Sequence, residues 1–208
     1  MAENDWTIRR ERADEYAKTE DLVREAFWNV YRPGCLEHYV LHCMRTDADF
    51  VSELDLVMEH AGELIGQVMC VRNELRPPAG PAIEVLTLGP ICIHPAHQRR
   101  GLGKILLDHS LALAAKTGAA GVFLEGNIGF YGKSGFVPAS TLGIRYMDEP
   151  EDDPVPYFLA KVLTDACFAG KGARYRVPRG YFVDEAEAAE FDRAFPPKER
   201  LKLPGQLV

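Results

Sequence analysis

A glycine-rich segment near the middle of the chain carries residues suited to holding an anion. It runs Gln98-Arg-Arg-Gly-Leu-Gly-Lys104, shortly after a predicted strand that ends at Pro95. Its two glycines allow a sharp turn and let a ligand approach the backbone amides closely. A helix is expected to begin near Gly103, so its unpaired amides and its dipole favour negative charge here. Because Arg99, Arg100 and Lys104 add positive charge, the segment predicts a pyrophosphate site.

Two known phosphate-binding loops do not fit this segment. A Walker loop needs four residues between its glycines and a hydroxyl residue after its lysine, whereas here only Leu102 separates the glycines and Ile105 follows the lysine. A dinucleotide-binding loop needs a third glycine at the position of Leu106. A glycine turn before an ordinary amphipathic helix is the plain alternative.

A third pattern, Q/R-x-x-G-x-G/A after a strand, fits completely and resembles the acetyl-CoA-binding motif of the GNAT superfamily of N-acetyltransferases. The preceding residues, Ile91-Cys-Ile-His-Pro95, have the family's hydrophobic-x-hydrophobic-x-Pro pattern. Tyr131-Gly-Lys-Ser-Gly-Phe136 matches its later Tyr-x-x-x-Gly-Phe motif. The turn at 126–131 also resembles the GD-x-x-YY turn of a poorly characterised branch of predicted bacterial acetyltransferases. The resemblance covers about residues 7–163.

The resemblance implies where acetyl-CoA, the cosubstrate, would bind. In the family it occupies a cleft between two diverging central strands, here 83–93 and 122–125. Backbone groups of Ile91 and Ile93, with Cys92 between them, would pair with the pantetheine arm. Lys133 would lie near the nucleotide, although it is equally well explained as a solvated surface lysine. The residues expected at the pyrophosphate are Gln98, Arg99, Arg100, Gly101, Leu102, Gly103 and Lys104.

The resemblance also implies direct attack of an amine on the thioester, with Tyr131 as the general acid for the departing thiolate. The alternative is a core tyrosine packed on Phe136. A base is useful because a lysine-like amine, with a pKa of about 10.4, is mostly protonated at pH 7, although water can carry the proton. The candidates are Glu84, on the central strand but before its interruption, and Glu125, at the end of the neighbouring strand. Glu84 is also explained as a solvated carboxylate.

Other reactive residues favour no separate chemistry. His94 and His97 flank a loop and lack further ligands, so we expect no metal site. Cys92 has no evident paired histidine, which favours a pocket-lining thiol over a nucleophile. The cysteines form an odd, scattered set without a C-x-x-C pair, which indicates reduced thiols. They are Cys35, Cys43, Cys70, Cys92 and Cys167.

The charge of the chain bears on its partners. The 208 residues have a formal net charge of −7, which argues against nucleic-acid binding. Residues 61–146, however, contain 8 basic and 5 acidic side chains, whereas residues 1–60 contain 14 acidic and 7 basic ones. The basic excess of residues 61–146 suits an anionic ligand, and the acidic excess of residues 1–60 favours a cationic acceptor.

The longest strictly hydrophobic run has five residues, 111–115, and no secretion signal is evident. We therefore expect a soluble, cytoplasmic protein without a membrane partner.

Alternating helices and strands must position these residues. Apolar periodicity predicts strands over 7–10, 54–60, 64–75, 83–93, 122–125, 136–138 and 157–163, and helices over 14–28, 36–45, 102–116, 128–133 and after Asp184. We expect Asp14 to cap the first helix and Ala61-Gly62 to form a hairpin turn. Gly89-Pro90 should force a bulge or splay in its strand, because proline cannot donate to the ladder. The family fold implied is α/β, with a mixed, mostly antiparallel sheet flanked by helices and with splayed central strands.

One domain with an extension is the expected organisation. An acidic, proline-rich segment, 147–156, is the clearest break in composition, but the strand expected beyond it belongs to the same sheet. We therefore expect an acetyltransferase domain over 1–163 and a C-terminal extension, 164–208, packed on it. The predicted activity is acetyl transfer from acetyl-CoA to the amine of a small molecule or protein. The alternatives are a catalytically silent acyl-CoA sensor and transfer of another acyl group or to an alcohol. A homodimer is compatible with the sequence.

Overall fold

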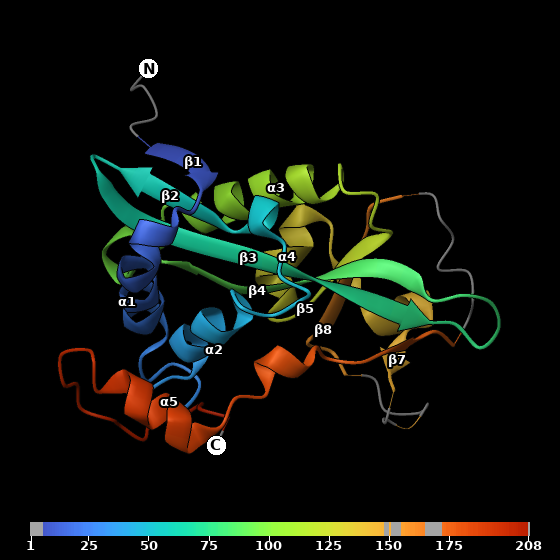
Figure 1. Cartoon of the computed structure of the whole chain (residues 1–208). Helices are drawn as coiled ribbons and strands as arrows, with labels where there is room; N and C mark the ends of the chain where they lie inside the picture. The colour runs from blue at the N-terminus through green and yellow to red at the C-terminus, as the bar shows by residue number, and fades with distance from the viewer. Residues whose placement is uncertain (1–5, 148–149, 151–154, 165–171, 208) are drawn as a thin grey trace.

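Among the residues that the structure describes, nine strands form one mixed sheet, and helices cover both of its faces (Figure 1). The structure is a computed structural model, and it describes residues 6–147, 150, 155–164 and 172–207. The strands are β1 (Trp6–Arg10), β2 (Leu56–His60), β3 (Glu63–Arg76), β4 (Ile83–Ile93), β5 (Gly121–Glu125), β6 (Val137–Pro138), β7 (Arg145–Tyr146), β8 (Phe158–Val162) and β9 (Arg174–Tyr175).

The order of the strands confirms the predicted fold class. Neighbours follow the order β1-β2-β3-β4-β5-β8-β6, and β9 pairs with both β3 and β7. The pairs β4–β5 and β7–β9 are parallel, and the other pairs along this path are antiparallel. The predicted hairpin turn between β2 and β3 is present, with left-handed backbone at both Ala61 and Gly62.

The strand β4 contains the predicted bulge. Gly89 and Pro90 both lie opposite Met69 of β3, because the pairing register shifts by one residue there. This two-against-one arrangement defines a β-bulge. After it, Ile91 and Ile93 pack into the same apolar cluster as the leucines before it. The extra residue therefore preserves which face of β4 is apolar.

The sheet opens where β4 leaves β5. The two strands pair only at Leu86–Val122 and Thr87–Phe123. Beyond these pairs β5 continues against β8, whereas residues 88–93 of β4 have no strand on that side among the described residues. The predicted splay of the central strands is thereby confirmed.

One long helix covers one face of the sheet, and two helices cover the other (Figure 1). Their bounds are α1 (Tyr16–Phe27), α2 (Glu37–Met44), α3 (Leu102–Ala114), α4 (Ile128–Tyr131) and α5 (Glu185–Asp192). The helix α3 packs its leucines against one face, and α1 and α2 pack against the other. Leu22 and Val23 are buried on the side of α1 that faces the sheet. Within the described part of the chain, none of the helices is both long and apolar enough to span a bilayer.

The predicted cap of the first helix is wrong. Asp14 lies inside a short 3-10 turn, Ala13–Glu15, that precedes α1. The Glu15 carboxylate instead accepts a 3.2 Å hydrogen bond from the amide of Arg12 and pairs with the guanidinium of Arg9 at 2.7 Å. These contacts start the turn one residue before Asp14, so its side chain is left exposed. The helix predicted after Asp184 is present as α5, and Asp184 caps it by accepting hydrogen bonds from two amides of the first turn.

Beyond β9, residues 179–207 pack along α1 and α2 (Figure 1). Arg24 of α1, only 1% exposed, lies 2.6 Å from Asp192 at the end of α5. Phe191 packs its ring 4.5 Å from that of His42 on α2. Four of the predicted free thiols are present as such, and they are Cys35, Cys43, Cys70 and Cys92; Cys167 lies outside the described residues.

Candidate functional site

The loop between β4 and α3 presents a row of open backbone amides. Gly101 caps α3 with left-handed backbone, at φ 82°, and Arg99 is also left-handed, at φ 59°. The amides of Lys104 and Ile105 donate to the Gly101 carbonyl, at 3.1 and 3.2 Å. The amides of 99–103 donate to no residue that the structure describes. Successive amides in such a turn form a concave anion-binding surface, which the helix dipole reinforces.

The positive charges around this loop are not equivalent. Arg99 and Arg100 are exposed and form no ion pair with a described residue. Lys104 instead pairs with Asp108 one turn further along α3. Although burial opposes it, hydrogen bonds from Lys104 and from Ser134, the latter at 2.6 Å, lower the pKa of Asp108. Two of the three predicted cations therefore stay available to an anion, and the third is largely neutralised.

Two other predicted contact residues have different surroundings. The Gln98 side-chain amide donates a 2.9 Å hydrogen bond to the Ile93 carbonyl, so it ties the loop to the end of β4. Lys133 is exposed in the short turn after α4. The structure thus gives Gln98 an internal partner and leaves Lys133 on the surface.

The end of β4 separates its side chains by face. Ile91 and Ile93 face the α3 side, while Cys92 is buried among residues of α1 and α2. Burial raises the pKa of Cys92 to about 12, so its thiol stays protonated and unreactive at neutral pH. Cys92 is therefore a buried thiol rather than a nucleophile.

Tyr131 combines a packed ring with an unpaired hydroxyl. A side chain on Gly126 would place its Cβ 2.2 Å from the Tyr131 ring, so this turn needs glycine. The rings of Phe130 and Phe136 meet it edge-on, at 4.8 and 5.7 Å. Its hydroxyl forms no hydrogen bond within the described residues. Burial raises the pKa of Tyr131 well above its ordinary value, which keeps the phenol protonated, as a proton donor must be.

The two predicted carboxylates lie apart. Glu84 is exposed near the start of β4, opposite Glu74 of β3 and five residues before Gly89. Glu125 lies at the end of β5, past the last pair that β5 makes with β4. Only Glu125 is thus brought to the open end of the sheet, where Tyr131 follows six residues later.

Sequence reasoning missed Glu37, the first residue of α2. Its carboxylate accepts a 2.9 Å hydrogen bond from the Leu36 amide, and burial raises its pKa. The charge of Glu37 adds to burial in raising the pKa of Cys92 and of Tyr31. An acid therefore lies on the α1–α2 side of the open strand. Its position at a predicted helix start was the available signal.

A second missed residue is Tyr181, in the C-terminal segment. Its hydroxyl donates a 2.6 Å hydrogen bond to the carbonyl of Gly89, in the bulge. The two residues are 92 positions apart, so no local pattern could have joined them.

The histidines expected to bind no metal are close but incomplete as a ligand set. The rings of His94 and His97 lie 6.0 Å apart, and His60 lies 5.8 Å from His97. Over the described ranges, no group of three or more His, Cys, Asp or Glu side chains is arranged to hold a metal ion.

The profile of the Acetyltransferase (GNAT) family matches residues 20–136, more than half of the chain. The chain therefore belongs to the GNAT acetyltransferase family. The match contains the open strand edge, the amide loop and Tyr131. A comparison with curated proteins finds no match.

Solved structures share the fold. One is a GNAT family N-acetyltransferase, YhbS from Escherichia coli, in complex with CoA, with a TM-score of 0.71 and 20% identity over 85% of this chain and 92% of that chain. Another is a GNAT family acetyltransferase from Brucella melitensis in complex with acetyl-CoA. Its TM-score is 0.59 and its sequence identity 25%, and the match covers 77% of this chain and 89% of that chain.

Proposed function

We propose that this protein transfers the acetyl group of acetyl-CoA directly to the primary amine of an acceptor. The observation that carries the proposal is the open edge of β4 at 88–93, which leads to the row of open amides at 99–103. Membership of the GNAT family and the neighbours in complex with CoA and acetyl-CoA support the same donor.

The residues present fit acetyl-CoA. Its pyrophosphate matches the amides of 99–103 and the guanidinium groups of Arg99 and Arg100, which have no other partner among described residues. The pantetheine arm would pair with backbone groups of β4 beyond Thr87, as an added strand does. The bulge would offer an amide to the thioester oxygen, where negative charge develops during transfer.

The chemistry is a single displacement. The amine nitrogen attacks the thioester carbon, the C–N bond forms and the C–S bond breaks. Tyr131 gives its proton to the departing thiolate, and the nitrogen loses a proton to a base. Glu125 is the better placed of the two predicted bases, because Glu84 lies away from the open end of the sheet. Holding the two reactants together supplies most of the acceleration.

Charge favours a cationic acceptor. The first 60 residues carry twice as many acidic as basic side chains, and Glu37 lies on the α1–α2 side of the opening. Making a lysine-like amine neutral at pH 7 costs about 4–5 kcal/mol. Nearby carboxylates would therefore have two roles, since they attract the ammonium ion and can then accept its proton. The amine specificity, the cytoplasmic location and the homodimer stay predictions.

A silent acyl-CoA-binding module is the alternative, and the position of Glu84 away from the opening is the observation that favours it. Release of free thiol from acetyl-CoA, measured across a panel of polyamines, aminoglycosides and lysine esters, separates the two. Release that depends on the amine supports the transferase. Thermal stabilisation by acetyl-CoA, without release for any amine, supports the silent module.

A further inference from the structure

The C-terminal segment reaches the bulge of β4 with a tyrosine. Tyr181 ends a 3-10 turn, Arg179–Tyr181, and its hydroxyl lies 2.6 Å from the carbonyl oxygen of Gly89. The ring packs into the apolar cluster that α1 and α2 form over β3 and β4. Burial raises the pKa of Tyr181 well above its ordinary value, so the hydroxyl stays a donor at neutral pH.

A second tyrosine of the same segment holds β4 two residues earlier. The hydroxyl of Tyr175, in β9, lies 2.8 Å from Oγ1 of Thr87, and both residues are buried. Thr87 is the last residue of β4 that pairs with β5. The two tyrosines therefore fix β4 at the point where it parts from β5 and at the bulge just beyond.

The segment that carries Tyr181 is anchored by other contacts. Asn73 of β3 donates a 2.9 Å hydrogen bond to the carbonyl of Arg176. The backbone at Gly180 lies so close to α2 that an added Cβ would be 2.6 Å from the sulfur of Met44. Loss of the Tyr181 hydroxyl alone should therefore leave the segment in place.

A bulge at an open strand edge needs such a restraint. Beyond Thr87, β4 has lost its β5 neighbour, and the two bulge residues face a single residue of β3. Gly89 is half-buried, and a carbonyl there that loses its donor favours a shift of β4 toward another partner. A shift of about 1 Å at a reacting group can cost about 100-fold in rate.

We propose that Tyr181 is a positioning residue for acyl transfer, which holds the Gly89–Pro90 bulge where its backbone meets the thioester. The inference rests on the proposed function. Tyr181 acts through Gly89 and does not touch the pyrophosphate loop. Its loss should consequently affect the acetyl end of the donor and spare the nucleotide end.

The test compares the affinities of the full-length protein for acetyl-CoA and for CoA by calorimetry. Tyr181→Phe should weaken acetyl-CoA binding about fivefold, change CoA binding less than about twofold and lower kcat about tenfold with an accepted amine. The matched control is Tyr39→Phe, which removes a 3.1 Å hydrogen bond from α2 to Glu187 of α5, away from the bulge. It should leave all three quantities unchanged.

Two results for Tyr181→Phe would overturn the proposal. One is an equal loss of affinity for acetyl-CoA and CoA, as a general destabilisation of the fold would cause. The other is no change in either affinity or in kcat, as expected for Tyr39→Phe. If Tyr181→Phe does not fold, Thr87→Val removes the hydrogen bonds of Thr87 with Tyr175 and with Asn73, and the same selective loss is expected. Failure of the proposed function would appear differently, as wild-type protein that neither binds acetyl-CoA nor releases thiol with any amine.

Discussion

The hydroxyl of Tyr146 donates a 2.6 Å hydrogen bond to Oε1 of Glu125, at the end of β5. Burial and this hydrogen bond raise the pKa of Tyr146 well above its ordinary value, so Tyr146 remains a donor at neutral pH. One oxygen of Glu125 is thereby held by the Tyr146 hydroxyl. The contact links β5 to β7, the short strand that pairs with the C-terminal β9.

Removal of the Glu125 charge should slow transfer. Glu125→Gln is expected to lower kcat/KM for the amine about 100-fold at pH 7, because the proton then leaves without a positioned acceptor. The loss should shrink as pH rises toward the pKa of the amine. Steady-state thiol release against pH measures both effects. Glu84→Gln is the control and should keep full activity. Glu37→Gln, in the same assay, tests whether the acid on the α1–α2 side contributes to transfer. If Glu125→Gln stayed fully active at pH 7, Glu125 would not be the base.

Replacement of Tyr131 should affect chemistry and spare binding. Tyr131→Phe is expected to lower kcat about 100-fold while the Kd for acetyl-CoA is unchanged, since the ring packing remains and only the proton donor is lost. Tyr157→Phe, at a tyrosine that is 53% exposed, is the control. Full turnover by Tyr131→Phe with unchanged affinity would exclude the general-acid role.

The loop arginines should contribute more to CoA binding than Lys104 does. Arg99→Ala and Arg100→Ala are each expected to raise the Kd for CoA about tenfold, because they remove charge-assisted contacts to the pyrophosphate. Lys104→Ala should have a smaller effect, since Asp108 already neutralises it. Calorimetry with CoA and with pantetheine, which lacks the pyrophosphate, gives the comparison. A similar loss of pantetheine affinity would contradict the assignment.

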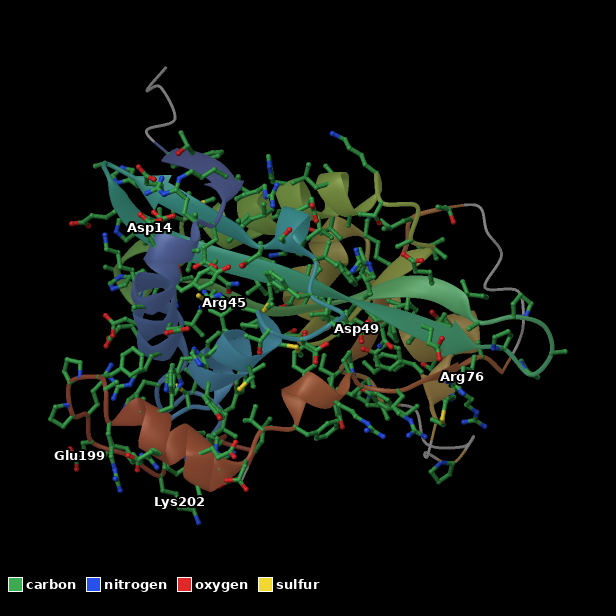
Figure 2. All side chains as sticks on the ribbon, viewed as in Figure 1. Asp14, Arg45, Asp49, Arg76, Glu199 and Lys202 are labelled. Atoms are coloured by element: carbon green, nitrogen blue, oxygen red, sulfur yellow. The ribbon has the colours of Figure 1, made fainter. Side chains whose placement is uncertain are left out.

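A buried acidic cluster should make stability depend on pH. Burial and the neighbouring Glu11 carboxylate raise the pKa of Asp55 to about 8, although Arg45 lies 3.9 Å away. Arg45, labelled in Figure 2, also pairs with Glu20 of α1 at 2.7 Å. The folded state holds a proton on Asp55 that the unfolded chain releases near pH 4, so the stability that this proton gives is lost as pH rises from about 4 to about 8.

Asp55→Asn should remove this dependence. The variant is expected to gain Tm relative to wild type as pH rises from 5 to 8, because an amide carries no charge to bury. Thermal denaturation of both proteins at each pH unit provides the measurement. Parallel curves for the two proteins would show that Asp55 does not titrate in this range.

The ion pair between the first and last helices should stabilise the docked C-terminal segment. Asp192→Asn leaves the Arg24 guanidinium buried without its partner, and we expect a loss of about 3 kcal/mol in the free energy of unfolding, measured with denaturant. Glu190→Gln, which removes an exposed pair with Arg193, should change little. Equal stability of the two variants would mean that the segment does not depend on Arg24.

Local signals predicted most of the fold, and contacts between distant residues explain what was missed. The bulge followed from Gly89-Pro90 and the amide loop from its glycines, because backbone geometry is set by neighbouring residues. The sequence could not show that Asp108 neutralises Lys104, although the spacing of one helical turn was a hint. The hydrogen bond from Tyr181 to the bulge depends on how the whole C-terminal segment folds back over α2, which no short pattern encodes.

Transfer of the acetyl group itself tests the account most directly. The full-length protein is incubated with deuterium-labelled acetyl-CoA and the amine panel, and products are identified by mass spectrometry. We expect an N-acetylated amine carrying the label, in equal amount to the CoA released, with both lowered together in Tyr131→Phe. Release of CoA without a labelled amine, or recovery of all the label on acetyl-CoA with every amine, would contradict it.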